Sequence, residues 1–282
     1  MKRTGIIILL SLLGTACAKP ANPDLTFTGT ENRFSTTEKR AWGGIEAIEN
    51  SFVMSGGKLL AFFDPAATGE MRKRDMASGA THSVLPRNAR FSYVIEHQGE
   101  LLNFVTIDGR INRMRSTDHG QTWTDQREIQ SAPMVQWNPG VVVDANGLWH
   151  MLIEASPTGA GPFQGNAACY YYTSPDGDTW TSHGLAIERC GNPFLVATTR
   201  GILVIHGDLE PGYWQTTAST FDGATWQTHR DKFLVFSPGV HVCDPHAIET
   251  NGKIILSVSV DQNSITLTEA ADSFESLHAR LR

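Results

Sequence analysis

The chain has 282 residues, of which 40% are hydrophobic and 18% are charged, and its formal net charge is -6. Ample apolar content and few charges exclude intrinsic disorder and coiled coil, and collagen-like and disulfide-scaffold folds do not match this composition. The acidic balance, with no basic run beyond Arg72, Lys73 and Arg74, argues against a nucleic-acid partner. A neutral or cationic small ligand fits better.

The first residues have the pattern of an export signal. Lys2 and Arg3 precede an apolar stretch, residues 5–13, that is too short to span a bilayer. The tripeptide Ala16-Cys17-Ala18 allows ordinary cleavage after Ala18, but it also resembles a bacterial lipobox in which Cys17 is lipidated. We favour the lipoprotein. The sequence thus predicts a signal peptide at residues 1–16 and an exported protein, anchored in the outer membrane or else periplasmic or secreted.

A repeat follows, in which an apolar strand, a turn containing Gly and a second apolar strand occur five times. The turn glycines are Gly57, Gly99, Gly147, Gly201 and Gly252, at spacings of 42, 48, 54 and 51 residues. One four-stranded blade fits each interval, because propeller repeats take roughly 40 to 50 residues. The sequence predicts an all-β fold, a five-bladed β-propeller of four-stranded antiparallel blades at residues 43–282. Residues 17–42 are either an N-terminal tether or a segment that closes the ring.

Three copies continue into a polar turn that ends in Trp. Ser116–Trp123 matches the Asp-box pattern S-x-D-x-G-x-T-W at every defined position, Ser174–Trp180 is one residue shorter, and Ser219–Trp226 is degenerate. In such a turn the Asp accepts hydrogen bonds from its own backbone, the Gly supplies a positive φ and the Trp packs between blades. We therefore expect these Asp residues to form turns rather than to catalyse.

On these turns the sequence resembles the sialidase-like, Asp-box family of β-propellers, and the stretches Arg90–Ile95 and Arg113–Asp118 look like a sialidase blade. The blade number is closer to the five-bladed glycoside hydrolases of the arabinanase and fructosidase type, with which Asp244-Pro245-His246 also agrees. A six-bladed sialidase-type propeller is the alternative fold. The resemblance implies a carbohydrate ligand and a site at the central funnel.

Alignment on the turn glycines places polar residues at the start of every inner strand. They are Glu49, Arg90, Asn138, Asn192 and Asp244. Three of them precede a Pro, which fixes the backbone and aims the side chain. The alternative is that strand starts near solvent are polar in any case.

The same alignment gives a second ring, of acids, near the end of each second strand. These are Asp64, Asp108, Glu154, Asp208 and Asp261, seven or nine residues after their glycines. Spacings of equal parity share one face of a strand. Trp42, Trp137, Tyr213 and Trp214 could stack on a sugar beside these rings, or pack between blades instead.

Glycoside hydrolysis requires two carboxyl groups, for which Glu49 and Asp244 from neighbouring blades are the candidates, with Glu154 as the acid. Arg90, Asn138, Asn192, Asp64, Asp108, Asp208, Asp261, His246, Trp137 and Trp214 are the candidate substrate-binding residues. The five-bladed hydrolases have acids at the inner-strand starts of blades one, two and three, and of these only Glu49 is present. A sialidase needs three arginines, and only Arg90 has a placement. The hypotheses are therefore a glycoside hydrolase, a non-catalytic module that binds a glycan or a protein, and an envelope assembly factor.

Other residues limit cofactors and crosslinks. His241 and Cys243 face away from Asp244 and His246 on a strand, which disfavours a zinc site. No cofactor is expected, although the resemblance implies that calcium could lie near His246. Cys169, Cys190 and Cys243 allow one disulfide whose pairing the sequence leaves open, or are three buried small side chains. We expect a monomer whose membrane contact is limited to the N-terminal lipid.

Overall fold

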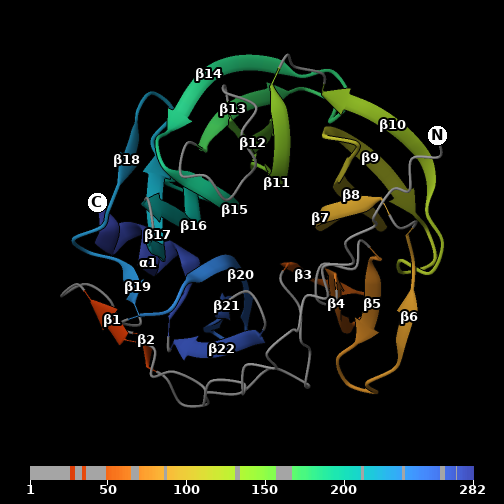
Figure 1. The fold of residues 1–282 in the computed structure, drawn as a ribbon, viewed down its shortest axis with the longest axis horizontal. Coiled ribbons are helices and arrows are strands. Elements are labelled where there is room, and N and C mark those ends of the chain that lie inside the picture. The colour runs from red at the N-terminus through yellow and green to blue at the C-terminus, as the bar shows by residue number, and fades with distance from the viewer. Residues whose placement is uncertain are drawn as a thin grey trace, which may run out of the picture.

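A computed structural model describes residues 26–28, 34–35, 49–64, 70–85, 88–130, 134–156, 167–210, 213–236, 239–260, 264–270 and 272–282. Within these ranges the chain forms antiparallel sheets arranged around a common axis (Figure 1). The expected signal peptide, Cys17 and Trp42 lie outside the described residues.

Five sheets are present among the described residues. The first contains β3 (Glu49–Ser55), β4 (Lys58–Asp64), β5 (Arg72–Asp75) and β6 (Thr81–Ser83). The second contains β7 (Ala89–His97), β8 (Glu100–Ile107), β9 (Arg110–Ser116) and β10 (Thr124–Gln130). The third contains β11 (Val135–Val143), β12 (Trp149–Ser156), β13 (Ala168–Ser174) and β14 (Thr181–Ile187).

The last two sheets each take up a strand from the N-terminal region. The fourth contains β15 (Cys190–Thr198), β16 (Gly201–Glu210), β17 (Tyr213–Phe221), β18 (Trp226–Thr228), β19 (Leu234–Phe236) and β1 (Thr26–Thr28). The fifth contains β20 (Val242–Thr250), β21 (Lys253–Val260), β22 (Ser264–Ala270) and β2 (Phe34–Ser35). Residues 26–28 and 34–35 thus form the outer strands of these sheets.

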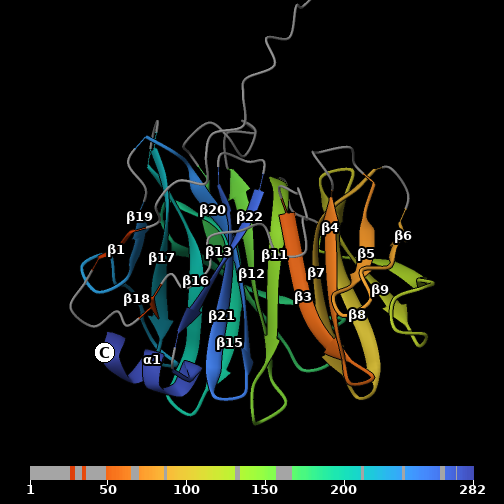
Figure 2. The same ribbon diagram turned by 90° about the horizontal axis from the view of Figure 1, so that it is seen from below.

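The inner strands β3, β7, β11, β15 and β20 lie next to one another around the axis, and β20 returns to contact β3 (Figures 1 and 2). The second strand of each sheet is buried on both faces because neighbouring sheets cover it, so β12 is buried along its whole length. The outer strand β6, in contrast, is exposed throughout. The prediction of an all-β propeller with four-stranded antiparallel blades is confirmed.

Each of the three polar turns is organised by its Asp. The Asp118 carboxylate accepts hydrogen bonds from the backbone N–H groups of Gln121 at 3.0 Å and Thr122 at 2.9 Å. Asp176 and Asp222 accept equivalent bonds within their own turns. These acids therefore shape hairpins on the outside of the sheets and lie away from the central axis.

The Trp at the end of each turn packs against an aromatic ring of the preceding sheet. Trp123 meets Phe62 with ring centroids 5.8 Å apart, and Trp180 meets Phe104 at 6.3 Å. Trp226 meets Tyr171 at 5.3 Å. Contacts of this kind bury apolar side chains between neighbouring sheets.

A disulfide joins Cys169 on β13 to Cys190 on β15, with 5.2 Å between the Cα atoms. It connects the third and fourth sheets across a sequence separation of 21 residues. Cys243 is not part of this bond; its buried Sγ lies 3.5 Å from Oδ2 of Asp244. The structure thereby settles the pairing that the sequence leaves open.

The chain ends in helix α1 (Phe274–Leu281), for which the sequence offers Ser273 as its one signal. Ser273 caps it by accepting a hydrogen bond from Ser276 N–H, and Phe274 packs against Phe194 at 6.0 Å between ring centroids. Within the described part of the chain, no helix has the length and apolar character to cross a membrane.

Candidate functional site

Four inner strands bulge at the same point near one end of the axis. The residues at the bulges are Phe91, Asn138, Asn192 and Asp244, with φ angles of 57°, 42°, 48° and 50°. The strand pairing shifts register at each of these points. Asn and Asp tolerate a positive φ better than most residues do, and in three strands the following Pro fixes the backbone. The bulges direct these side chains toward the axis.

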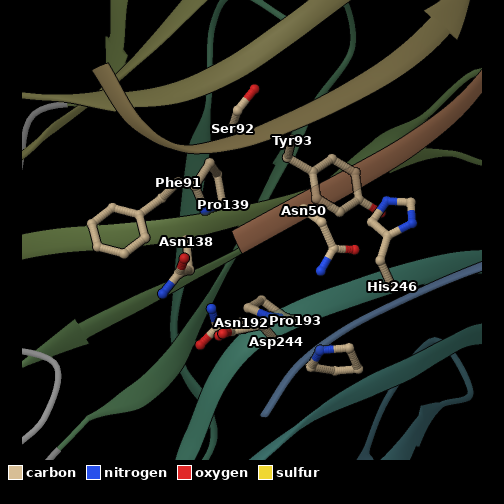
Figure 3. A pocket seen from close by; sticks show the side chains of 11 residues that line it. Asn50, Phe91, Ser92, Tyr93, Asn138, Pro139, Asn192, Pro193, Asp244 and His246 are labelled. Atoms are coloured by element: carbon tan, nitrogen blue, oxygen red, sulfur yellow. The ribbon is translucent and has the colours of Figure 1, made fainter. Parts of the chain in front are cut away.

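A small pocket lies where the bulges meet (Figure 3). Its lining includes Asn50, Phe91, Asn138, Asn192, Asp244 and His246. Its volume is about 30 Å³, which is room for a group the size of a water molecule or a hydroxyl. A larger ligand would therefore insert only one end of itself here.

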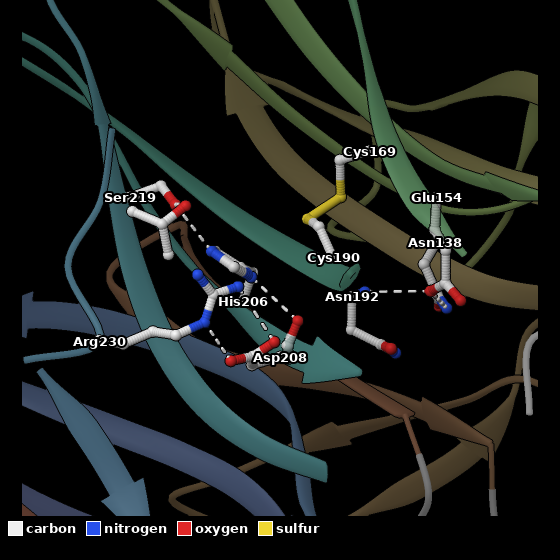
Figure 4. Close-up of a disulfide and its surroundings, with 11 residues drawn as sticks. Asn138, Glu154, Cys169, Cys190, Asn192, His206, Asp208, Ser219 and Arg230 are labelled. Atoms are coloured by element: carbon white, nitrogen blue, oxygen red, sulfur yellow. Dashed lines mark hydrogen bonds and ion pairs between the residues drawn. A yellow bond between two sulfur atoms is a disulfide. The ribbon is translucent and has the colours of Figure 1, made fainter. Parts of the chain in front are cut away.

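Behind this lining lies Glu154, only 1% exposed. Oε2 of Glu154 accepts hydrogen bonds from Nδ2 of Asn138 at 2.7 Å and from the backbone N–H of Asn192 at 3.1 Å (Figure 4). Burial raises the pKa of Glu154 to about 7, and the nearby Asp244 charge adds to this effect. Glu154 thus holds two lining residues in place and is itself covered by them.

Asp244 is the acid of the described lining. Burial raises its pKa to about 7, against the opposing effect of hydrogen bonds with Ser259, Cys243 and Asn192. A carboxyl group with such a pKa exchanges its proton near neutral pH. It can therefore either donate a hydrogen bond to a ligand or accept one from it.

His246 closes the inner end of the pocket together with Tyr93, its ring centroid lying 5.5 Å from that of Tyr93 and 4.4 Å from that of Phe194. The backbone N–H of Phe52 points at Nδ1 at 3.4 Å, so Nδ1 is an acceptor and Nε2 carries the proton toward Ser51 Oγ at 3.4 Å. Burial lowers the pKa of His246 to about 3. The imidazole is therefore neutral at physiological pH.

The structure changes the ring expected at the inner-strand starts. Asn138, Asn192 and Asp244 line the pocket, but the inner strand β7 contributes Phe91, and Arg90 is exposed outside the lining. On the first strand Asn50 lines the pocket. Glu49 begins β3 and pairs with Asp64, and its side chain lies outside the described part of the chain.

The second ring of acids does not form on one face. On each bulged inner strand, the residue just before the bulge pairs with one residue of the second strand of the same sheet. These partners are Thr106, Glu154, Gly207 and Ser259, so Glu154 is the one expected acid among them. On the first sheet, whose pairing is regular, Asp64 is buried opposite Glu49. A spacing of nine residues is wrong on the second sheet, where Thr106, seven residues after Gly99, pairs with Arg90. On the fourth sheet Gly201 is itself paired with Thr198, which brings Gly207 into this position in place of Asp208.

The remaining expected acids have other surroundings. Asp108 is exposed in the turn between β8 and β9, with φ of 52°. Asp208 is buried and ion-paired with Arg230, and its Oδ1 lies 3.4 Å from Nε of Arg189 (Figure 4). Asp261 lies outside the described residues. Asp108 and Asp208 are thus not part of the pocket lining.

Two of the expected sugar-stacking aromatics, Trp137 and Trp214, are not part of the pocket lining. Trp137 is buried on β11, opposite Glu154. Trp214 is buried beside Leu209 and Cys243, with its ring 5.1 Å from that of His241. The Tyr213 side chain is outside the described part. Phe91, which was not among the expected residues, is an aromatic residue that lines the pocket beside the amides.

Calcium near His246 does not fit the surroundings of this residue. The imidazole lies among the rings of Phe52, Tyr93 and Phe194, whereas calcium takes six to eight oxygen ligands. In the part of the chain that the structure describes, no three His, Cys, Asp or Glu side chains gather in a way that could hold a metal ion.

These features define a β-propeller with a polar pocket at one end of its axis. No family model matches the sequence, and no curated protein matches it. Among solved structures, it is similar to an endo-arabinase from Bacteroides thetaiotaomicron VPI-5482, with a TM-score of 0.66 and 10% identity over 85% of this chain and 99% of that one.

Two further solved structures extend the comparison. The xylan β-1,4-xylosidase from Bacillus Halodurans C-125 has a TM-score of 0.62 and 10% identity over 82% of this chain, which spans 54% of the xylosidase. A β-1,2-mannobiose phosphorylase from Listeria innocua has a TM-score of 0.56 and 11% identity over 78% of this chain and 69% of that one. At these identities the likeness concerns the fold, which is that of propellers found in carbohydrate-processing enzymes.

Proposed function

We propose that the pocket at the bulged strand starts binds the end of a carbohydrate. The observation that carries this proposal is the convergence of Asn138, Asn192 and Asp244 from three separate strands on one hydroxyl-sized space. Amides and a carboxyl group donate and accept hydrogen bonds together, as sugar hydroxyls require. The neighbouring Phe91 offers an apolar surface for the C–H side of a sugar ring. The substrates named for the similar structures support this ligand class.

Exo-acting glycoside hydrolysis is the second candidate. The pKa of about 7 for Asp244 favours it, because a general acid or base works best when its pKa is near the working pH. Hydrolysis needs a second carboxyl group at the bond, and Glu154 is covered by Asn138 and Asn192. Glu49 is the remaining candidate for that partner. Binding thus requires fewer groups than catalysis does, and we favour binding.

Calorimetric titration with short arabino-, xylo- and manno-oligosaccharides tests the binding proposal. We expect Asp244→Asn to weaken the binding of the recognised sugar roughly tenfold, because the amide can neither carry the negative charge that strengthens an accepted hydrogen bond nor donate the O–H of the protonated acid. Asp108→Asn is the matched control, since Asp108 also has a positive φ but is exposed in a turn. Equal affinity in both variants, or no binding of any of these sugars, would refute the proposal.

The same sugars presented as aryl glycosides test hydrolysis. If the protein is a hydrolase, Glu49→Gln and Asp244→Asn each abolish release of the aryl group while the Asp108→Asn variant keeps wild-type turnover. Turnover that persists in both pocket variants would show that these carboxyl groups are not the catalytic pair.

The number of blades and the relation to a family are further parts of the proposal. Five sheets among the described residues and the return of β20 to β3 support a five-bladed ring. The three Asp turns are the basis for a relation to the sialidase-like family.

We also propose that the protein is exported as a lipoprotein, on the basis of its N-terminal sequence. Palmitate labelling that is lost in Cys17→Ser would support this proposal, and labelling that persists in this variant would refute it.

A further inference from the structure

A second and larger cavity opens from the other end of the axis. Its volume is about 620 Å³, within the range of roughly 300 to 1,000 Å³ that is usual for small-molecule sites. Among its lining residues are Val53, Met54, Val94, Val142, Leu195 and Ile248. They follow the pocket-lining residues along the same inner strands, so the two spaces lie in series along the axis.

Aromatic side chains separate the two spaces. Tyr93 and His246 belong to the walls of both, and Phe194 lines the larger cavity. The Tyr93 hydroxyl also accepts a hydrogen bond from the backbone N–H of Leu195 at 3.2 Å, which fixes its ring across the axis. The cavity is therefore a site of its own and not an extension of the polar pocket.

The charges of this cavity are all of one sign. Glu96 and Asp144 are its acidic residues, His97 lies next to Glu96, and no Lys or Arg belongs to the lining that the structure describes. Glu96 is exposed, with Oε1 accepting a hydrogen bond from Gly99 N–H at 2.7 Å. Oδ1 of Asp144 accepts bonds from the backbone N–H groups of Asn146 and Leu148, and its Oδ2 lies 3.3 Å from Nε2 of His150. These backbone contacts hold two carboxylates beside an apolar space.

We propose that this cavity binds an elongated apolar molecule with a cationic end group. The valine, leucine and isoleucine walls would cover the apolar part, since burying apolar surface is the main favourable contribution. The carboxylates of Glu96 and Asp144 would attract the cation and disfavour an anion. This proposal does not depend on sugar binding at the polar pocket.

Three eight-carbon probes test the proposal: octyltrimethylammonium, 1-octanol and octanoate, each below the concentration at which it aggregates. We expect one equivalent of octyltrimethylammonium to bind, roughly tenfold more tightly than octanoate, with a difference that shrinks as salt is added. Octanol should fall between them. Equal binding of all three would overturn the cationic preference, and no binding of any would overturn the site.

Substitutions in the cavity wall test whether the probe binds in the cavity. Met54 is 45% exposed on the wall, so Met54→Trp should fill the space, keep the fold and weaken binding of the cation at least tenfold. Ile248→Trp should fill the cavity from β20, and it replaces Met54→Trp in the test if that variant has a lower melting temperature than the wild type. Leu185→Trp, at a residue that is 53% exposed on β14, is the matched control and should bind as wild type does.

Glu96→Gln separates charge from shape, because it keeps the oxygen that faces Gly99 N–H and removes the charge. We expect it to reduce the preference for the cation over octanoate and to leave octanol binding unchanged. An unchanged preference would overturn the role of the carboxylate. Unaltered probe binding in both tryptophan cavity variants, with both folded, would overturn the location.

Discussion

At the scale of single residues, Glu154 and Asp244 are two acids whose surroundings make their charged forms costly. Burial raises the pKa of each to about 7, and the Asp244 charge further raises that of Glu154. The hydrogen bonds from Asn138 and Asn192 offset only part of the cost of burial. These acids therefore couple the fold and the pocket to pH.

The first prediction concerns the free energy of unfolding between about pH 4 and pH 7. In this window the folded protein holds protons on Glu154 and Asp244 that the unfolded chain has released, so the contribution of these two groups to stability falls as pH rises. The loss would be about 3 kcal/mol for a carboxyl shifted by roughly two units or more. We expect Glu154→Gln to remove the Glu154 contribution, so that its free energy of unfolding changes more positively with rising pH than that of the wild type, as measured by urea unfolding at several pH values.

Buried histidines act in the opposite direction and are unaffected by that variant. Burial lowers the pKa of His206 and of His278 to about 4 and that of His246 to about 3, so their contribution to stability is lost as pH falls below about 6.5. Asp108→Asn is the control, since its carboxyl is exposed. A Glu154→Gln slope as steep as that of Asp108→Asn would contradict the prediction.

At the scale of elements, the sequence reveals repeats better than it reveals register. Alternating apolar strands, turn glycines and Asp turns were enough to predict a propeller with four-stranded blades. Gly57 lies inside its turn, since Ser55 pairs with Lys58, whereas Gly201 is itself the first residue of β16 and pairs with Thr198. A turn glycine therefore does not have the same offset from the axis in each sheet.

The bulges explain why some site residues were predicted and others were missed. Asn138, Asn192 and Asp244 each precede a Pro, and that local signal marks the bulge directly. Phe91 has the same backbone conformation with Ser92 after it, so nothing in the sequence distinguished it from Arg90. An error of one residue in the alignment of a strand assigns a side chain to the opposite face of the sheet. Helix α1 had a Ser cap as its only signal.

The second prediction concerns the disulfide. Cys190 lies two residues before Asn192, and Cys169 is paired with Glu154 between β12 and β13, so the bond joins the segments that carry both (Figure 4). We expect replacement of Cys169 and Cys190 by Ala to lower the free energy of unfolding by roughly 3 kcal/mol. Sugar binding at the pocket should weaken as well, because Asn192 loses a fixed neighbour.

Cys243→Ala is the comparison for the disulfide variant. Cys243 is buried but outside the disulfide, and its replacement removes a small packing contact and the hydrogen bond from Sγ to Asp244, so it serves as the comparison for stability. Melting temperature measured on both variants, and sugar affinity measured on the double variant against the wild type, decide the outcome. If the double variant is as stable as Cys243→Ala, the disulfide contributes little, and if only stability falls, it does not position Asn192.

At the scale of the whole molecule, the ring closes in two ways. The inner strand β20 contacts β3, and Phe52 N–H points to Nδ1 of His246 across that junction. At the outer edge, β1 pairs with β19 and β2 pairs with β22, so residues from the start of the chain complete sheets built from its end. Strands distant in sequence thus protect two edges from solvent and from other chains.

The last prediction follows from these edges. A chain that begins at residue 36 lacks both β1 and β2 and leaves the backbone groups of β19 and β22 without those neighbours. Exposed edge strands invite pairing with other molecules, so we expect a lower melting temperature and concentration-dependent association in light scattering. A chain that begins at residue 19 keeps both strands and is the control, expected to show neither effect. Identical melting and scattering of the two chains would mean that contact between β20 and β3 alone closes the ring.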